Sequence, residues 1–99
     1  MITKFYITTA IDYVNSRPHL GHALEKLQAD VLARWHRLKG DDVWFLTGTD
    51  ENAQKNVLAA EAAHQPVKTF VDQNVIYFQE LLKVLEISND DFIRTTDRD

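Results

Sequence analysis

The sequence lacks cysteine altogether among its 99 residues. This absence excludes disulfide bonds, thiolate nucleophiles and cysteine zinc sites within these residues, and it is compatible with a reducing compartment. Long apolar runs are also missing, so we expect no signal peptide, no membrane partner and a cytoplasmic protein. Glycine and proline are scarce, and no repeat or low-complexity segment occurs, which predicts one globular domain over residues 1–99.

Positive charge is in short supply as well. Eleven Lys and Arg residues stand against fifteen Asp and Glu residues, which gives a formal net charge of −4 at pH 7. The overall field therefore repels a polyphosphate backbone, and the cluster of Arg34, Arg37 and Lys39 is too small to form a basic stripe. If nucleic acid is a partner, we expect its main docking surface to lie outside these residues.

The first third of the chain predicts a strand followed by a long helix. Residues 4–10, KFYITTA, alternate apolar and polar side chains as a half-buried strand does. From residue 20 the period becomes that of a helix of about five turns. Basic residues and then Gly40 end this helix, which suits a left-handed C-terminal cap. We expect its apolar stripe to lie in the core; the stripe comprises Leu20, Leu24, Leu27, Val31, Trp35 and Leu38.

The remaining segments complete an α/β pattern. Residues 41–48, DDVWFLTG, are typical of a strand buried on both faces, which would place Trp44 in the core. Strand, long helix and strand predict a right-handed βαβ unit whose parallel strands are either adjacent or separated by another strand. Residues 51–64 and 67–87 predict two more helices, separated near Pro66, and residues 92–95 predict a third strand.

The segment HLGH, residues 19–22, lies where the first strand region leads into the long helix. Ligands of parallel α/β sheets bind beyond the carboxyl ends of the strands, and free N–H groups at a helix start favour an anion. His19 and His22 add two hydrogen-bond donors, and Gly21 between them would let a base or phosphate approach the backbone. Such donors suit the stabilisation of charge on a phosphoryl group under attack.

Two other interpretations of HLGH stay open from the residues alone. The histidine pair could be half of a metal site, although the chain offers neither cysteine nor a clear third ligand, so we assign no metal site. The segment could instead be a structural helix start, with Pro18 as the first helical residue.

The surroundings of HLGH resemble the methionyl-tRNA synthetase family, which belongs to the class I aminoacyl-tRNA synthetases. Two segments carry the resemblance: ITTAIDYVNSRPHLGHALEKLQADVLARWHRLKGDDVWFLTGTDENAQK and, near the end of the chain, DFIRTTD. Other class I synthetases share a HIGH-type signature but not the TTAIDYVN and FLTGTDE segments. The resemblance implies a Rossmann-like (HUP-type) parallel sheet with flanking helices, of which residues 1–99 would be the N-terminal half only.

The resemblance also implies an activity. A protein of this family activates methionine with ATP, as the Mg²⁺ complex, and then esterifies the methionine to tRNA(Met). Carried over residue by residue, His19, Gly21 and His22 would bind ATP, and the two histidines would be catalytic through their contacts with the phosphates.

Methionine would be bound by three further residues on the same grounds. Ile11 and Tyr13 would line its pocket, and Asp50 would hold its α-ammonium group. From the residues alone, Asp50 or Thr49 could equally cap a helix that starts within TGTDENAQK.

Four positions depart from the family pattern. Ala10 replaces a common proline, Asp12 replaces a common tyrosine, and Asn52 and Ala53 stand where a His-Gly pair is usual. Asp12 adds negative charge beside the proposed site, and the change at Asn52 puts any role of that loop in doubt.

The resemblance further implies that several parts of the family's enzyme lie outside residues 1–99. These are the connective insertion with its zinc-binding cysteines, the KMSKS-type loop and the anticodon-binding domain, so no zinc site is expected here. We expect the isolated chain to bind ATP weakly and to be inactive. A truncated sheet would also leave an unpaired edge through which the chain could self-associate.

Two other functions compete with this one. A small nucleotidyltransferase shares an HxGH turn in a similar fold, and would transfer nucleotides without any other chain. A non-enzymatic or half-enzyme module would need completion by another polypeptide that carries the KMSKS-type loop.

Overall fold

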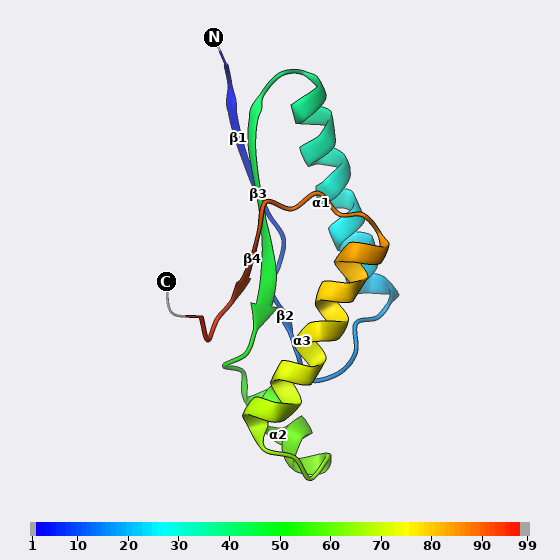
Figure 1. Cartoon of the computed structure of the whole chain (residues 1–99), viewed down its shortest axis with the longest axis vertical. Coiled ribbons are helices and arrows are strands. Elements are labelled where there is room, and N and C mark those ends of the chain that lie inside the picture. The colour runs from blue at the N-terminus through cyan, green and yellow to red at the C-terminus, as the bar shows by residue number, and fades with distance from the viewer. Residues whose placement is uncertain (1, 98–99) are drawn as a thin grey trace.

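The computed structural model describes residues 2–97 as a parallel sheet with helices packed against it (Figure 1). The predicted long helix, the strand that follows it, the helix pair and the last strand are all confirmed, whereas the two-residue strand β2 was not predicted. The elements in chain order are β1 (Lys4–Thr8), β2 (Asp12–Tyr13), α1 (Leu20–Leu38), β3 (Asp42–Asp50), α2 (Gln54–Ala62), α3 (Val67–Val84) and β4 (Asp91–Arg94).

β3 is the central strand, and every other strand pairs with it in parallel. β1 pairs with residues 42–46 of β3, and β2 pairs with residues 49–50. β4 pairs with residues 46–49, which overlap both of those stretches, so it lies on the opposite side of β3. β1 and β2 therefore follow one another along the same side of β3, and no strand separates β1 from β3.

A single layer of helices covers the sheet. Figure 1 shows α1 and α3 against the same side of the strands, and α2 beyond the end at which β3 terminates. The molecule measures only 17 Å along its shortest principal axis, compared with 54 Å along its longest. One face of the sheet is therefore packed, and the other face is open.

Two apolar clusters fill the space between the helices and the sheet. The first surrounds Phe45 of β3, which is fully buried against Ala29 and Ala33 of α1. The second joins Val14, which follows β2, to α3, and its α3 members are Val71, Val75 and Phe78. Because alanine carries only a methyl group, α1 lies close to the strands on this face.

The expected core face of α1 is wrong. Its large apolar side chains point to solvent: Leu20 is 85% exposed, Val31 64% and Trp35 56%. The face that packs on the sheet carries small and charged residues, namely Ala23, Lys26, Ala29, Asp30 and Ala33. Periodicity identified the helix correctly but could not tell which of two candidate faces would be buried.

No helix within residues 2–97 is long and apolar enough to cross a membrane.

The expectation that β3 is buried on both faces is also wrong. Alternate side chains of a strand point to opposite faces, and only one face of this sheet meets helices. Phe45 faces the helices, whereas Trp44 is 48% exposed and lies opposite Tyr6 of β1, which is 61% exposed. Trp44 is therefore not a core residue in this structure.

The end of α1 follows the predicted capping pattern. Gly40 adopts a left-handed conformation with φ of 90°, and its N–H donates to the carbonyl of Arg37 at 3.0 Å. The Asp41 N–H donates to the carbonyl of His36, which completes the turn that leads into β3. The His36 ring also stacks on Phe5 of β1, with ring centroids 3.5 Å apart, so it fixes the helix end to the sheet edge.

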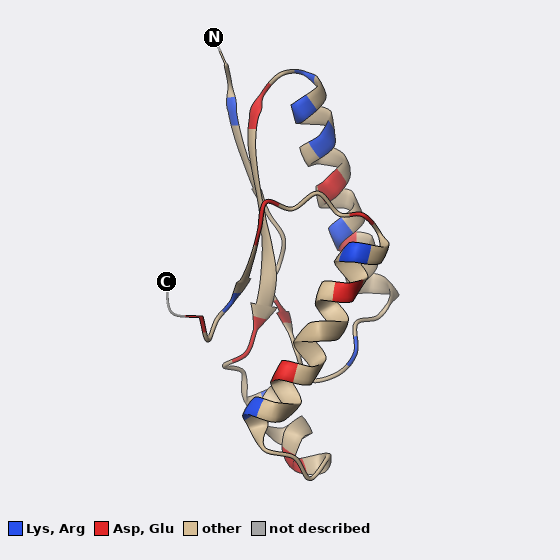
Figure 2. Ribbon diagram, viewed as in Figure 1, with Lys and Arg blue, Asp and Glu red and all other residues tan. Residues whose placement is uncertain are grey.

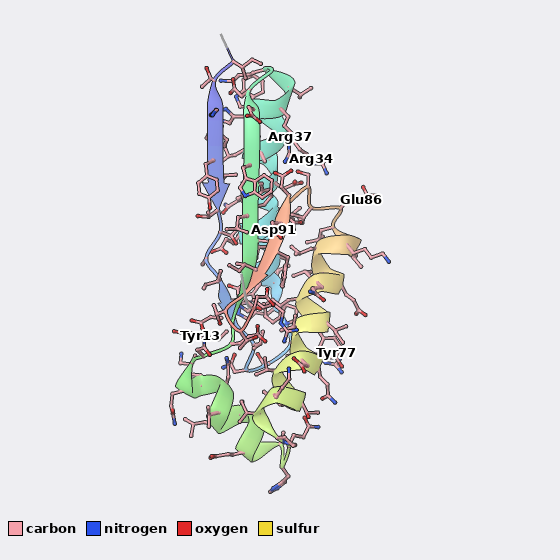
Figure 3. The ribbon with its side chains drawn as sticks, turned by 60° about the vertical axis from the view of Figure 1, so that its left-hand side comes forward. Tyr13, Arg34, Arg37, Tyr77, Glu86 and Asp91 are labelled. Carbon is pink, nitrogen blue, oxygen red and sulfur yellow. The ribbon has the colours of Figure 1, made fainter. Side chains whose placement is uncertain are left out.

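Charged residues join α1 to the segment that precedes β4. Figure 2 shows basic positions on the later turns of α1 and acidic positions on the connection from α3 to β4. Arg37 donates to Asp90, and Arg34, labelled with Arg37 in Figure 3, donates to the carbonyl of Glu86. Burial raises the pKa of Asp30, but hydrogen bonds from Ser88 and Arg34 outweigh this effect and hold that pKa below its ordinary value.

Because helices cover only one face of β3, Phe45 and its neighbour Trp44 should differ in how much they contribute to the free energy of unfolding. Replacing Phe45 with Ala should lower the free energy of unfolding by about 3–5 kcal/mol, because it leaves a cavity among buried side chains. The same change at Trp44 should cost much less, since that ring is already half exposed. Urea-induced unfolding of both variants measures the difference, and equal losses would contradict the open sheet face.

Candidate functional site

The candidate site lies at the carboxyl ends of the strands, where the chain passes from β2 into α1. Tyr13, the last residue of β2, pairs with Asp50, the last residue of β3. Figure 3 labels Tyr13 at this end of the sheet, close to where α2 begins. The strand pairing thus brings together two of the residues to which the resemblance assigned a role.

The two histidines of HLGH form a reciprocal cap at the start of α1. His19 is the N-cap residue, and its Nδ1 accepts a hydrogen bond from the N–H of Gly21 at 3.0 Å. His22 Nδ1 accepts from the N–H of His19 at 3.1 Å. The Gly21 N–H is therefore occupied by the His19 ring, whereas the sequence suggested that it would be free for an anion. Pro18 precedes the cap and is not the first helical residue.

This cap determines which nitrogen of each ring carries the proton. A neutral imidazole has one N–H donor and one acceptor, and both Nδ1 atoms serve as acceptors here. The proton of each ring is therefore on Nε2. The rings of His19 and His22 stack with centroids 3.8 Å apart, and His22 also contacts Phe78 of α3. The first turn of α1 thus presents two imidazole Nε2–H donors.

Gly21 is needed for this arrangement. A Cβ at position 21 would come within 2.9 Å of Cε1 and 3.1 Å of Nδ1 of His19, so a side chain would force the ring to move. The sequence predicts another reason for glycine here, which is that a ligand can approach the backbone. The contact with His19 is an additional reason for glycine at this position.

Two residues of α3 fix the loop between β2 and α1. Asn74 is buried, and its side-chain N–H donates to the carbonyl of Val14 at 2.8 Å. Arg17 lies over the ring of Tyr77, 4.4 Å from its centroid, and donates to the Tyr77 hydroxyl at 3.0 Å. Tyr77 is labelled on α3 in Figure 3. The loop that carries His19 is therefore held by α3.

A cavity of about 470 Å³ opens beside the histidines. Four of the six predicted site residues line it, namely Ile11, Tyr13, His19 and His22. Gly21 and Asp50 are not among the lining residues, although each is adjacent to one that is. The remaining lining residues, which the sequence did not assign to the site, are Asp12, Asn15, Ser16 and Lys55.

Two of those unassigned residues carry charge. Lys55, near the start of α2, places its ammonium nitrogen 5.5 Å from the ring centroid of Tyr13. Asp12 bonds to Lys26 of α1, with its Oδ2 2.6 Å from the lysine Nζ. The sequence shows the departure at Asp12 but does not identify its partner, because the two residues meet only when α1 packs on β2.

His22 is held in its neutral form. Burial lowers the pKa of the His22 imidazole below its ordinary value of 6.5. The nearby carboxylate of Asp12 acts in the opposite direction, while His19 and Lys26 add to the lowering. The capping bond agrees with this direction, because a protonated Nδ1 could no longer accept from the His19 N–H.

Asp50 does not cap a helix. α2 begins at Gln54 with Ala53 as its N-cap residue, and no side chain caps it. Asp50 is the last residue of β3, and its Oδ1 accepts from the N–H of Asn52 at 3.1 Å. The capping alternative is therefore wrong, and the carboxylate closes only a local turn.

The residue after Asp50 is anchored by an ion pair that the sequence did not reveal. Glu51 has a side chain only 1% exposed, and Arg94 of β4 donates to both of its carboxylate oxygens. Arg94 also bonds to Asp72 of α3, and Thr96 donates to Glu51. This network gives the RTT segment a structural purpose, because it fixes the backbone that follows Asp50.

No group of three or more His, Cys, Asp or Glu side chains within residues 2–97 could hold a metal ion.

Comparisons with known proteins agree on one family. The family described as tRNA synthetases class I (M) matches residues 5–99. Methionine–tRNA ligase of Thermotoga maritima is 53% identical over 94 residues, which cover 95% of this chain and 15% of that protein. The ligase of Rickettsia conorii is 50% identical over 97 residues, or 98% of this chain and 19% of that protein.

A solved structure shows the same fold. Methionyl-tRNA synthetase of Mycobacterium tuberculosis, bound by methionyl-adenylate, matches with a TM-score of 0.94 at 48% identity. The match covers 96% of this chain and 19% of that one. The chain thus spans between 15% and 19% of the length of these relatives. The Rossmann-like sheet with flanking helices, expected from the resemblance, is confirmed.

The cap predicts the behaviour of His22 in solution. Long-range ¹H–¹⁵N NMR should find the Nε2–H tautomer at pH 7 and a titration midpoint below 6.5. Because the unfolded chain then binds the proton more readily, this residue should make the fold less stable as the pH falls below about 6.5. A midpoint above that value, or the Nδ1–H tautomer, would contradict the capping geometry.

Proposed function

Because the chain belongs to the family of class I tRNA synthetases (M), we propose that residues 1–99 form the N-terminal part of the catalytic, nucleotide-binding domain of a methionine–tRNA ligase. Such an enzyme activates methionine with ATP and transfers the methionyl group to tRNA(Met). The observation that carries the proposal is the pair of Nε2–H donors of His19 and His22, which border the same cavity as Ile11 and Tyr13.

His19 and His22 act on the phosphates of ATP. In the activation step a carboxylate oxygen of methionine attacks the α-phosphorus, an O–P bond forms, and the bond to the leaving pyrophosphate breaks. Negative charge builds on the phosphoryl oxygens during this displacement. Donors already fixed by the cap stabilise that charge without reorganising, and neither histidine becomes covalently attached. Gly21 keeps the His19 ring in place and gives the adenosine access to the backbone.

Ile11, Tyr13 and Asp50 serve the methionine. Ile11 and Tyr13 supply apolar surface to the cavity that the histidines also line. Asp50 pairs with the α-ammonium group and leaves the substrate carboxylate free to attack. Support for this role comes from the strand pairing of Tyr13 with Asp50 and from a carboxylate that has only one local hydrogen bond.

Mg²⁺ enters with ATP. When bound, it would supply neutralisation of the charge on the departing pyrophosphate. The chain has no cysteine to supply the thiolate ligands of a zinc site.

The site in this chain is one half of a nucleotide site. Because the resemblance places the KMSKS-type loop outside residues 1–99, the isolated chain binds ATP weakly and does not aminoacylate tRNA. The tRNA contacts, the KMSKS-type loop and the rest of the sheet belong to other parts of the enzyme, which works in the cytoplasm. The open sheet face with Tyr6 and Trp44, together with the outer edge of β1, favours self-association of the isolated chain.

Replacing His19 with Asn separates catalysis from capping. Asparagine is a good N-cap residue but offers no imidazole donor, so the melting temperature should stay close to that of the parent. Methionine-dependent ATP–pyrophosphate exchange should fall by roughly 10²–10³. The assay uses a family member in which residues 1–99 replace the matching segment, and the unmutated graft is the reference. Unchanged exchange in a folded variant would refute the proposal.

The same assay on residues 1–99 alone tests the half-site. We expect a folded chain without exchange, and recovery when a separate chain supplies the KMSKS-type half. Exchange by the isolated chain would mean that it contains a complete site.

Asp50→Asn tests the methionine contact in the grafted enzyme. Asparagine retains an oxygen that accepts from the Asn52 N–H, so stability should change little. Losing the charge should weaken methionine binding by roughly 10- to 100-fold, with a small effect on ATP binding. A large drop in melting temperature with unchanged methionine affinity would instead assign Asp50 a structural role.

A further inference from the structure

A buried ion pair between Lys26 and Asp12 lies next to His22. Lys26 of α1 has a side chain only 3% exposed, and its Nζ lies 2.6 Å from Oδ2 of Asp12, which is 10% exposed. The same nitrogen lies 2.8 Å from Oε1 of Glu25 and 3.3 Å from the carbonyl of Ala10. These three acceptors satisfy all the N–H groups of the ammonium, so its position is well determined.

This lysine occupies an unusual position on the helix. It lies on the face of α1 that packs on the sheet, among Ala23 and Ala29, while large apolar residues of the same helix are exposed. A charged side chain is rarely buried unless it is paired. The burial of Lys26 therefore depends on its two carboxylate partners, of which Asp12 is the nearer and the more buried.

Asp12 belongs to the site as well as to the ion pair. Its carboxylate lines the cavity beside the histidines, and its Oδ1 lies 3.9 Å from Nε2 of His22. That nitrogen carries the proton that would be donated to a phosphate. An uncompensated carboxylate at this distance would repel a polyphosphate and compete for the same proton.

We propose that Lys26 is the charge-compensating residue of the nucleotide site: it cancels the carboxylate of Asp12 beside His22 and thereby keeps the cavity favourable to a polyphosphate. The inference rests on the proposed function, since it assumes that the phosphates of ATP meet His22. Lys26 is a positioning residue in this role, because it reaches the ligand only through Asp12 and His22.

The other groups around His22 do not supply this compensation. His19 stacks on the ring and bears no negative charge to be compensated, and Glu25 is a second carboxylate. α3 contributes the uncharged ring of Phe78. Lys55 of α2 lines the same cavity, yet no carboxylate lies within ion-pair distance of it in residues 2–97, so it adds positive charge without neutralising Asp12.

A double-mutant cycle on the 99-residue chain tests the proposal. The variants are Lys26→Met, Asp12→Asn and the combination of both, with Lys83→Met and Asp42→Asn as controls that remove the same charges at exposed positions far from the site. Two quantities are measured by ¹⁵N NMR of the imidazoles: the titration midpoint of His22, and the affinity for inorganic triphosphate at pH 7.

The single variants should act in opposite directions. Lys26→Met leaves Asp12 unpaired, so the His22 midpoint should rise and triphosphate affinity should fall roughly tenfold. Asp12→Asn should lower the midpoint and leave triphosphate binding as tight or tighter. The combined variant should return the His22 midpoint towards that of the parent and the triphosphate affinity to within about twofold of it. The control variants should change neither quantity.

A purely structural ion pair gives a different result. Both single variants would then weaken triphosphate binding together, without opposite shifts of His22, and the combined variant would not recover; this result overturns the proposal. If a thermal melt shows that Lys26→Met does not fold, the Asp12→Asn variant is used alone. An unchanged or raised His22 midpoint in that variant overturns the proposal. If triphosphate moves neither histidine of the parent, the isolated half-site binds too weakly for this readout; the His22 midpoints then decide the compensation, and pyrophosphate exchange in the grafted enzyme decides the nucleotide site.

Discussion

Backbone pairing along β3 is the constraint on which the rest of the structure depends. This strand is the one partner shared by β1, β2 and β4, and its register places Tyr13 beside Asp50 at the carboxyl end of the sheet. The same register brings β4 alongside, so that Arg94 reaches Glu51, directly after Asp50. A shift of one residue would turn each of these side chains to the other face of the sheet.

The polar groups of the site bond to one another. His19 and His22 complete each other's hydrogen bonds at the helix start, and α3 holds the preceding loop through Asn74. Preorganised donors of this kind are effective in catalysis since they do not reorganise as charge develops. The neighbouring carboxylates are also paired, with Lys26 on Asp12 and Arg94 on Glu51.

The apolar surface that stays exposed is consistent with a part of a larger domain. Val31 and Trp35 of α1 and Trp44 of β3 are each about half exposed or more, on surfaces that no element of residues 2–97 covers. The relatives are more than five times as long as this chain, since it spans 15–19% of them. Burying these surfaces would add the apolar contacts that a single helical layer does not provide.

The sequence by itself determined most of the local structure: periodicity indicated α1, α3 and every strand except β2, Gly40 marked the helix end, and HLGH with its flanking segments indicated the family. Those features depend on neighbours within a few residues, which a pattern contains. Only the tertiary structure decided which face of α1 is buried, that Asp50 ends a strand, and which charges pair. These depend on contacts between residues far apart in the chain, such as Asp12 with Lys26, and on how many layers pack against the sheet. A periodic pattern carries no information about either.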